Sequence, residues 1–370
     1  MNAVISQSDV VTAYGWGLDA LWNSLMSGKT AIAPTQRFAE RGFISDQAAI
    51  IEDLSPEPNE SRVMAMLRRL LTPILGTLDP ATPLILASTV GEIEFIERAV
   101  LENNSAMLTE ARPQALVQRV RQMLGLRGEA IALSSACASS AAALTRAASM
   151  IQHGEAPAVL VVTCDAISEF VYGGFSSLMS LSPRAARPFD AGRDGLTLGE
   201  AAAWALVTTR REGISILGWG NTTDAVHMTA PDRNAGGLTR AIDKALAMSR
   251  KKHNDICLIA AHGTGTVYSD AMEMVAFQRG FQSSVPVFSV KGGVGHTLAA
   301  AGLVQILVAG RAISSGHAPP TVGLGNVDAG AAGWARNAPA DLGTTRVALS
   351  TNSGFGGVNT ALVLGAAVDA

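Results

Sequence analysis

Apolar runs typical of β-strands recur along the chain, and a turn of small residues followed by a helical stretch comes after several of them. The clearest examples are Ala130–Ser134 before Ala138–Gln152, Ile256–Ala261 before Ser269–Phe277, and Val285–Val290 before Thr297–Ser314. Strands that alternate with helices predict an α/β protein with largely parallel sheets between helical layers. Near the end, Val347–Thr351 and Asn359–Leu364 flank the loop NSGFGG and predict a terminal hairpin.

Composition supports a large buried core and excludes several classes of protein. Of the 370 residues only 16% are charged and 48% are hydrophobic, whereas about 25% charged is usual. This argues against disorder, and a net charge of −3 without basic runs argues against nucleic-acid binding. We expect no membrane span, because no apolar stretch reaches ~18 residues. Three unclustered cysteines and no signal peptide predict a reducing cytoplasm.

The segment Leu133–Ser140, LSSACASS, places Cys137 at the turn between an apolar strand and a helix built almost wholly of Ala and Ser. The unpaired N–H groups and the dipole at the start of that helix favour a thiolate, so Cys137 is a candidate nucleophile. Because the helix is made of small residues, it can be buried on every side, with the cysteine at the bottom of a pocket. The alternative is a buried structural cysteine.

Two further strand ends carry histidines. In Ala261–Glu273, AHGTGTVYSDAME, His262 follows a strand, and Thr264 and Thr266 offer hydroxyls to an amide-bearing ligand. In Ser289–Gly302, SVKGGVGHTLAAAG, His296 opens a helix, which favours its neutral form and an Nε2–H donor. A loop histidine satisfied by the backbone is the alternative for His262.

Lys291 lies in a mostly apolar setting, so we expect it to be buried and paired, with Glu273 or Asp270 as the candidate partner. In the terminal loop, Phe355 is flanked by Gly354, Gly356 and Gly357, which indicates a mobile hinge with a bulky plug. An ordinary hairpin turn whose phenylalanine packs on the core is the alternative there.

Together these blocks resemble the elongating β-ketoacyl-ACP synthases, the condensing enzymes of fatty-acid and polyketide synthesis. The order Cys, His, Lys/His and GFGG matches that family. Three further stretches are similar to it, namely RPFDAGRDGLTLGEAAA (187–203), DAVHMTAPD (224–232) and GWGLDALWNSLMSGKTAI (15–32). The resemblance runs from about residue 10 to 365.

The resemblance implies the thiolase fold, in which two βαβαβαββ halves related by pseudo-twofold symmetry pack as five layers, α-β-α-β-α. A softer seam near Thr208–Gly213 predicts halves at residues 1–210, with Cys137, and 211–370, with the histidines and the Phe355 loop. It also implies an acyl carrier protein as partner, and a homodimer or a heterodimer with a related ketosynthase subunit.

The implied reaction moves an acyl group onto Cys137 and then condenses it with a decarboxylating malonyl thioester. The resemblance gives His262 and His296 the role of enolate donors, assigns Lys291 to the same catalytic set, and makes the N–H groups of Cys137 and Phe355 the oxyanion site. Its remaining carried-over positions are Thr264, Thr266, Gly356 and Ser353 for substrate, Asp270 and Glu273 for support, and Arg62, Arg68 and Arg69 for carrier docking. No metal or organic cofactor is expected, since phosphopantetheine arrives on the carrier.

The chain departs from the family pattern in several places. Ser353 stands where a second phenylalanine is usual, Ala201, Ala203 and Ala299 replace glycines, and the chain is shorter between Gly91 and Gly125 and before Arg187. These changes would suit a chain-length factor, a sister subunit that need not condense, but such subunits usually lack the cysteine. Thiolases need a second active cysteine near the C-terminus, type III synthases need an asparagine motif, and a scaffold module needs no catalytic set. The residues therefore favour an active synthase.

Overall fold

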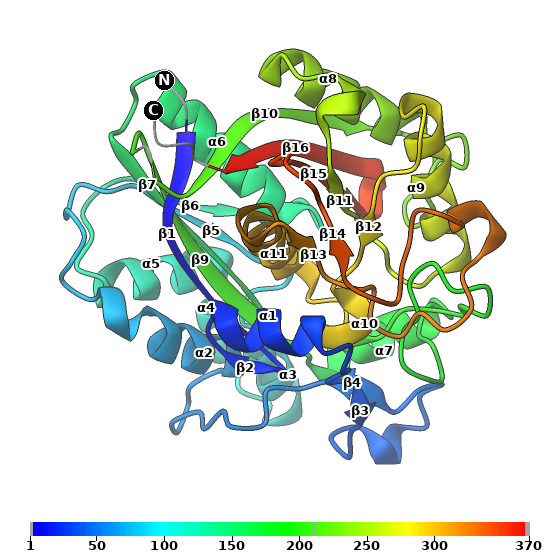
Figure 1. Cartoon of the computed structure of the whole chain (residues 1–370). Helices are drawn as coiled ribbons and strands as arrows, with labels where there is room; N and C mark the ends of the chain where they lie inside the picture. Colours follow the sequence, from blue (N-terminus) through cyan, green and yellow to red (C-terminus); the bar gives the residue numbers. More distant parts are fainter. Residues whose placement is uncertain (1–2, 211, 367–370) are drawn as a thin grey trace.

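Ten strands form two sets of five with the same internal order in the computed structural model, which describes residues 3–210 and 212–366 (Figure 1). The first set runs, in spatial order, β6 (Ala130–Leu133), β5 (Leu84–Ala87), β7 (Ala158–Asp165), β9 (Ala201–Thr208) and β1 (Ala3–Thr12). The second runs β12 (Val287–Phe288), β11 (Leu258–Ala260), β15 (Val347–Gly354), β16 (Val358–Ala366) and β10 (Ile214–Thr223). The first three strands of each spatial order, β6-β5-β7 and β12-β11-β15, are parallel to one another. The last two strands of each order continue the sheet through antiparallel pairs.

The two sets meet where β1 pairs antiparallel with β10, with Ala3 opposite Ile216. Identical strand order and direction on both sides of this junction produce the pseudo-twofold arrangement that the resemblance implied. The first set ends with β9 at Thr208 and the second begins with β10 at Ile214. The division into residues 1–210 and 211–370 stays a prediction, and residue 211 itself lies outside the described residues.

The two five-strand sets are the first and second halves of one continuous sheet, called here the first and the second sheet, and helices separate and cover them to give five layers (Figure 1). The inner layer contains α6 (Ser139–Gln152) and α11 (Ala301–Ser315), with α1 (Leu18–Met26) packed beside them. The outer layers are α2 (Arg62–Leu71) and α5 (Pro113–Met123) on the first sheet, and α8 (Gly236–Ser249) and α9 (Val267–Gly280) on the second. The predicted thiolase fold is thereby confirmed.

Small residues explain how α6 and α11 can lie against each other at the centre of the molecule. Ser140 in the first turn of α6 accepts a hydrogen bond from the backbone N–H of Leu303 in α11, at 2.9 Å.

Within the described residues, Leu298–Ser315 is the one helical stretch long and apolar enough to cross a membrane. Of this stretch 83% is buried inside the protein, where it forms part of the core.

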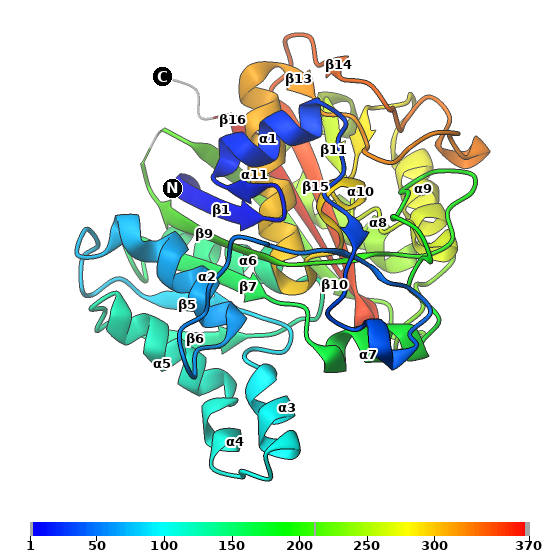
Figure 2. The ribbon, with the colours of Figure 1, turned by 90° about the horizontal axis from the view of Figure 1, so that it is seen from below.

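The elements expected from the sequence are present at nearly the expected bounds, including the terminal hairpin of β15 and β16. Other helices are α3 (Glu94–Leu101) and α4 (Met107–Glu110), which project from the body in Figure 2, α7 (Glu169–Ser177) and α10 (Lys291–Val294). Short strands complete the fold: β2 (Gly15–Trp16), β3 (Ala33–Pro34), β4 (Gln47–Ala49), β8 (Leu198–Gly199), β13 (His317–Ala318) and β14 (Ala340–Asp341).

Candidate active site

Cys137 lies in the turn between β6 and α6, as predicted, and its side chain is buried. The preceding residue, Ala136, has φ +49°, a left-handed conformation that costs energy for a residue with a Cβ. Ser139 holds this turn, because its hydroxyl accepts from the N–H of Ser135 at 2.8 Å and donates to the carbonyl of Ala136 at 2.5 Å. The strained turn directs Cys137 into the cavity described below.

Burial controls the ionisation of Cys137. Burial is the main reason that the pKa of the thiol is raised to about 11, and the nearby Asp165 carboxylate contributes to this rise. The Lys291 ammonium and the backbone N–H groups of Phe355 and Cys137, which hydrogen-bond the sulfur, lower the pKa by less. The expectation of a favoured resting thiolate is therefore wrong: removal from water outweighs the favourable groups, and the thiol is the resting form.

The Phe355 loop packs directly against the cysteine turn. Glycine at position 354 allows this close approach, since a Cβ there would lie a tight 3.1 Å from the carbonyl oxygen of Ser135 and 3.2 Å from the backbone nitrogen of Cys137. This approach brings the Phe355 N–H to the sulfur, so the two expected oxyanion donors face the same atom. The Phe355 ring stacks on Phe175 of α7 with 5.7 Å between centroids. Gly356, at φ +81°, is exposed and turns the chain away.

Ser353 belongs to a polar chain that the sequence did not reveal. Its hydroxyl donates to Oδ1 of Asn359 at 2.7 Å, and Nδ2 of Asn359 donates to Oδ1 of Asp224 at 2.9 Å. The backbone N–H of Asp224 donates to the carbonyl of Gly357 at 2.8 Å. A serine at position 353 therefore anchors the start of the Phe355 loop to the segment that follows β10.

His262 is held at the end of β11 by a buried carboxylate. Glu273 of α9 accepts from the N–H groups of His262 and Gly263 at 2.7 and 2.6 Å and from the hydroxyl of Thr351 at 2.9 Å. Burial, the Lys291 charge and then His296 hold the pKa of His262 well below its usual value, so the ring is neutral. Glu273 thus supports the histidine, as the resemblance implied.

Lys291 is fully buried, as expected, but its direct partner is the His262 residue. The ammonium donates to the backbone carbonyl of His262 and lies 3.4 Å from its Nδ1. Among the described residues it has no carboxylate within salt-bridge distance, so the expectation of a direct pair with Glu273 or Asp270 is wrong. The His262 backbone lies between the Lys291 ammonium and the Glu273 carboxylate, whose charges interact through space. Burial lowers the pKa of Lys291 to about 8. An ammonium beside Nδ1 makes that nitrogen an acceptor and places the ring proton on Nε2.

His296 presents its Nε2 proton in the same way. The backbone N–H of Leu298 donates to Nδ1 at 3.2 Å, which fixes the tautomer of the neutral ring. Burial, followed by the Lys291 charge, holds its pKa well below the usual value. The prediction of a neutral Nε2–H donor is supported by this geometry, with burial as the largest cause. The rings of His262 and His296 meet edge to face, 5.4 Å apart between centroids.

Asp165, at the end of β7, fixes the turn after His296 and was not singled out from the sequence. Its fully buried carboxylate accepts from the Ala299 N–H at 2.8 Å, the Ser88 hydroxyl at 2.7 Å and the Thr89 N–H at 3.0 Å. Leu298, the residue whose N–H sets the histidine tautomer, has φ +51° and needs such support. An acid at the end of one apolar strand gives no sequence signal that it supports a turn far along the chain.

Asp270 supports in the same way the loop that carries Thr264 and Thr266. It accepts from the N–H groups of Thr264 and Gly265 at 2.9 and 3.1 Å and from that of Phe189 at 2.7 Å. Burial raises its pKa to about 6. The hydroxyls of Thr264 and Thr266 lie 2.9 Å apart and face the cavity.

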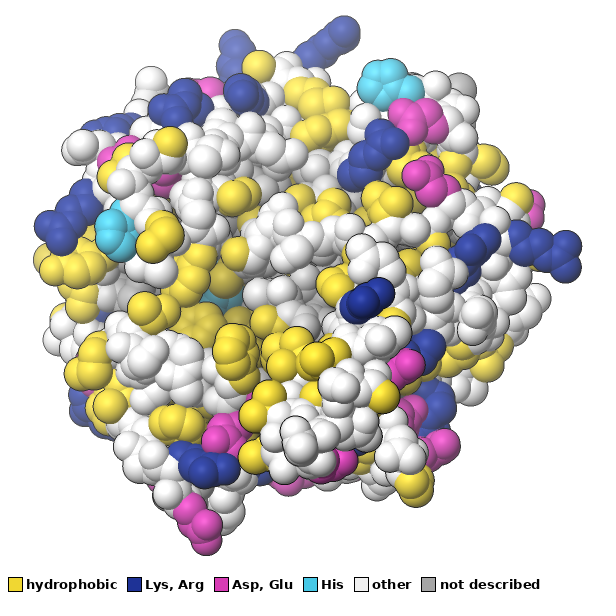
Figure 3. All heavy atoms as spheres, turned by 180° about the vertical axis from the view of Figure 1, so that it is seen from behind, with side chains coloured by type: hydrophobic (Ala, Val, Ile, Leu, Met, Phe, Trp, Pro, Cys, Tyr) yellow, Lys and Arg dark blue, Asp and Glu magenta, His cyan; other side chains and the backbone are white. Residues whose placement is uncertain are grey.

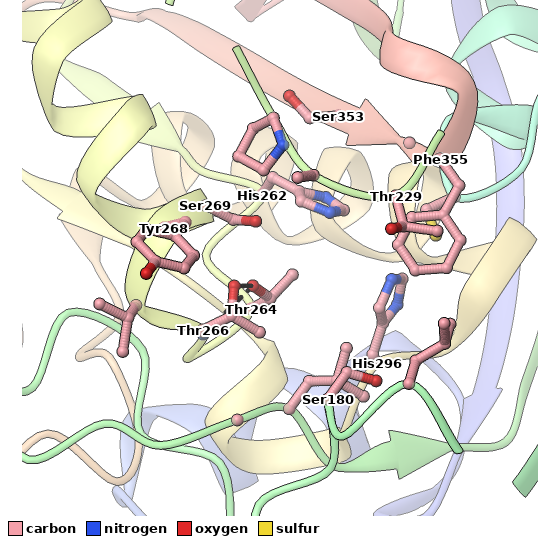
Figure 4. A pocket seen from close by; sticks show the side chains of 18 of the residues that line it. Ser180, Thr229, His262, Thr264, Thr266, Tyr268, Ser269, His296, Ser353 and Phe355 are labelled. Carbon is pink, nitrogen blue, oxygen red and sulfur yellow. Dashed lines mark hydrogen bonds between the residues drawn. The ribbon is translucent and has the colours of Figure 1, made fainter. Parts of the chain in front are cut away.

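One cavity of about 360 Å³ brings these groups together. Figure 3 shows an apolar-lined hollow with a histidine at its base, and Figure 4 shows Thr264 and Thr266 between Tyr268 and the two histidines. Its lining includes Cys137, His262, His296, Thr264, Thr266, Ser353 and Phe355. A thiol, two Nε2–H donors and two backbone N–H donors around one space can perform acyl transfer and stabilise an enolate.

The three arginines expected to dock a carrier do not form a basic patch. Arg62 is wrong as a docking group, because its guanidinium turns inward to the buried Glu200 at 2.6 Å. Arg68 pairs with Glu60 at 2.8 Å and Arg69 with Asp53 at 3.0 Å. Nearby acids therefore compensate the charge of both exposed arginines.

Comparisons with known proteins agree with this geometry. The family models for the β-ketoacyl synthase N-terminal and C-terminal domains match residues 82–213 and 214–325. The 3-oxoacyl-[acyl-carrier-protein] synthase 2 of Coxiella burnetii is 30% identical over 416 aligned positions, which cover all of this chain and 99% of that protein.

Two solved structures are similar over 99% of this chain at 26% identity. They are a β-ketoacyl synthase from Burkholderia phymatum, with TM-score 0.89 and 99% of that chain covered, and a ketosynthase in complex with its chain length factor from Xenorhabdus doucetiae, with TM-score 0.87 and 98% covered. Sequence, fold and site geometry lead to one conclusion: the chain belongs to the β-ketoacyl synthase family.

Proposed function

We propose that this chain is an acyltransferase that catalyses decarboxylative Claisen condensation of an acyl group on Cys137 with malonyl-ACP. The observation that carries the proposal is the shared cavity of Cys137, His262 and His296, with the Phe355 N–H on the cysteine sulfur. Its product is a β-ketoacyl chain two carbons longer, in fatty-acid or polyketide synthesis.

In the first half-reaction the sulfur of Cys137 forms a bond to the acyl carbonyl carbon, and the carrier thiol leaves with the proton. The N–H groups of Cys137 and Phe355 stabilise the negative charge that develops on the carbonyl oxygen. Because the resting thiol is protonated, formation of the nucleophile is the demanding part of this step.

In the second half-reaction the malonyl thioester loses CO₂, and the electron pair of the broken C–C bond becomes an enolate. The Nε2–H donors of His262 and His296 stabilise the charge on its oxygen. The enolate carbon then attacks the acyl carbonyl, and Cys137 leaves and regains a proton. We further propose that no metal or organic cofactor takes part and that the protein acts in the cytoplasm.

The partners follow from the same proposal. A carrier-bound substrate requires an acyl carrier protein, as the name of the Coxiella burnetii relative states for that enzyme. A homodimer or a heterodimer with a related ketosynthase subunit is consistent with the exposed apolar side chains of Val100 and Leu101 on α3, which are 74% and 75% exposed.

Product formation by the purified chain tests the proposal. Acyl-ACP and malonyl-ACP should give β-ketoacyl-ACP by intact-mass spectrometry, and Cys137→Ser should give none while keeping the wild-type circular dichroism spectrum. The second candidate is a chain-length-factor-like subunit, favoured by the shortened chain. It would be supported if the chain alone formed neither acyl-enzyme nor product, and a related ketosynthase became active only when the chain was added.

A further inference from the structure

Arg233 lies next to a residue at the solvent-exposed edge of the catalytic cavity and does not itself line the cavity. Its guanidinium carbon sits 4.2 Å from the ring centroid of Tyr268, a residue that lines the cavity and is 55% exposed. Arg233 comes two residues after Pro231, another lining residue, and is itself exposed. An aromatic ring at the exposed edge of the cavity therefore holds a cation beside the cavity.

Arg233 differs from the other arginines that stack on rings within residues 3–210 and 212–366. Four others do so, and each also donates to an oxygen: Arg37 to Glu200, Arg69 to Asp53, Arg98 to the carbonyl of Glu60, and Arg119 to Glu92 and Glu110. In these ranges Arg233 has neither a carboxylate within 4 Å nor a hydrogen-bonded oxygen.

The neighbouring acids are already occupied. Both carboxylate oxygens of Asp232 accept backbone N–H groups, from Asn234 and Gly236, at 3.0 Å each. Asp194, which also lines the cavity, pairs with Arg184 at 2.8 Å. Stacking uses only the face of a guanidinium, so the in-plane N–H groups of Arg233 stay available for a ligand.

The ligand that fits here is an anion that can accept hydrogen bonds from the planar guanidinium N–H groups of Arg233, beside the outer end of the cavity. Phosphate oxygens accept such donors in a bidentate arrangement. Along the cavity, the thiol and imidazoles lie at the inner end, the two threonine hydroxyls follow, and Tyr268 lies at the solvent end (Figure 4). A phosphopantetheine thioester has its reactive group, its amides and its phosphate in the same order.

We propose that Arg233, held by Tyr268, binds the phosphate of the phosphopantetheine arm, which would make these two residues an outer substrate subsite. This inference rests on the proposed function and extends it, by naming the group that fixes the outer end of the substrate. The subsite contributes to binding of the thioester and takes no part in bond making.

The test compares two small substrates, malonyl-phosphopantetheine and malonyl-pantetheine, which differ only in the phosphate. For wild type, CO₂ release should show kcat/KM about tenfold higher for the phosphorylated substrate, the size expected for a charge-assisted contact. Arg233→Gln should reduce this ratio to about one through KM, and Arg233→Lys should leave an intermediate ratio. Arg69→Gln, which changes another stacked arginine, is the matched control and should keep the wild-type ratio.

Three outcomes would overturn the phosphate subsite. The first is a wild-type ratio near one, and the second is an Arg233→Gln ratio equal to that of wild type. The third is an effect of Arg233→Gln on malonyl-ACP alone, which would assign the arginine to an acidic side chain of the carrier. Failure of the proposed function is distinct, because wild type would then release CO₂ from neither small substrate.

Discussion

The resting state of Cys137 gives a quantitative prediction about reactivity and pH. A pKa of about 11 leaves a thiolate fraction of about 10⁻⁴ at pH 7, so ionisation costs about 5 kcal/mol. An ordinary thiol with a pKa of about 8.5 needs only about 2 kcal/mol. We therefore expect iodoacetamide to alkylate Cys137 roughly 300-fold more slowly than a free thiol at pH 7, with about a tenfold rise per pH unit up to pH 10.

Alkylation measured by peptide mass spectrometry provides the assay, because it separates Cys137 from Cys164 and Cys257. Lys291→Met removes the nearest favourable charge and should slow the alkylation of Cys137 at pH 7. The pKa of Lys291 is lowered to about 8, so wild type loses the same charge as pH rises through 8. The difference between the two proteins should then shrink. A rate that reaches a plateau below pH 8 in wild type would refute this reasoning and restore a resting thiolate.

Three further predictions follow from the contacts. Asp165→Asn should slow malonyl decarboxylation about tenfold, measured as CO₂ release, because it loosens the turn that orients His296. It should not slow acylation of Cys137, because it removes a charge that raises the pKa of the thiol; equal loss in both steps would contradict it. Ser353→Phe should narrow the range of acyl primers, tested by competition among several lengths and one aryl primer, without slowing decarboxylation; an unchanged ranking would make Ser353 a tolerated substitution. Arg62→Ala should lower the free energy of unfolding in urea by about 3 kcal/mol and Arg68→Ala by less than about 1 kcal/mol, because of these two arginines Arg62 pairs with the fully buried carboxylate of Glu200, which it shares with Arg37; equal losses would argue against the inward pairing.

The sequence predicted the elements whose signals are local. Apolar runs followed by small-residue turns placed the strands and helices around Cys137 and His296 within a few residues of their observed bounds. The fold itself required the resemblance, because strand order depends on pairings such as β1 with β9 that join residues far apart in the chain. No periodicity in a single sequence records such a pairing.

The same distinction applies to the site. The cysteine and histidines that face the cavity stand in recognisable turns of small residues and were identified, whereas other lining residues, such as Phe175 and Tyr268, and the supports from distant elements were not. Asp165 meets Ala299 across 134 positions, and Arg62 meets Glu200 across 138. The charges of the α2 arginines were visible in the sequence, but the acids that neutralise them were not assigned to them. The pKa of Cys137 was misjudged because the sequence analysis counted the favourable helix start and not the cost of removing a thiolate from water, although it placed the cysteine at the bottom of a pocket.

The division of labour between Cys137 and the two histidines is the central claim, and one experiment separates the half-reactions. His262→Ala and His296→Ala should each accept an acyl group on Cys137, seen as an adduct by intact-mass spectrometry. Each should release labelled CO₂ from malonyl-ACP at least about tenfold more slowly than wild type, since each removes one donor to the enolate oxygen. Wild-type CO₂ release by both variants would contradict the assignment of the histidines, and so would loss of the acyl adduct with the fold intact.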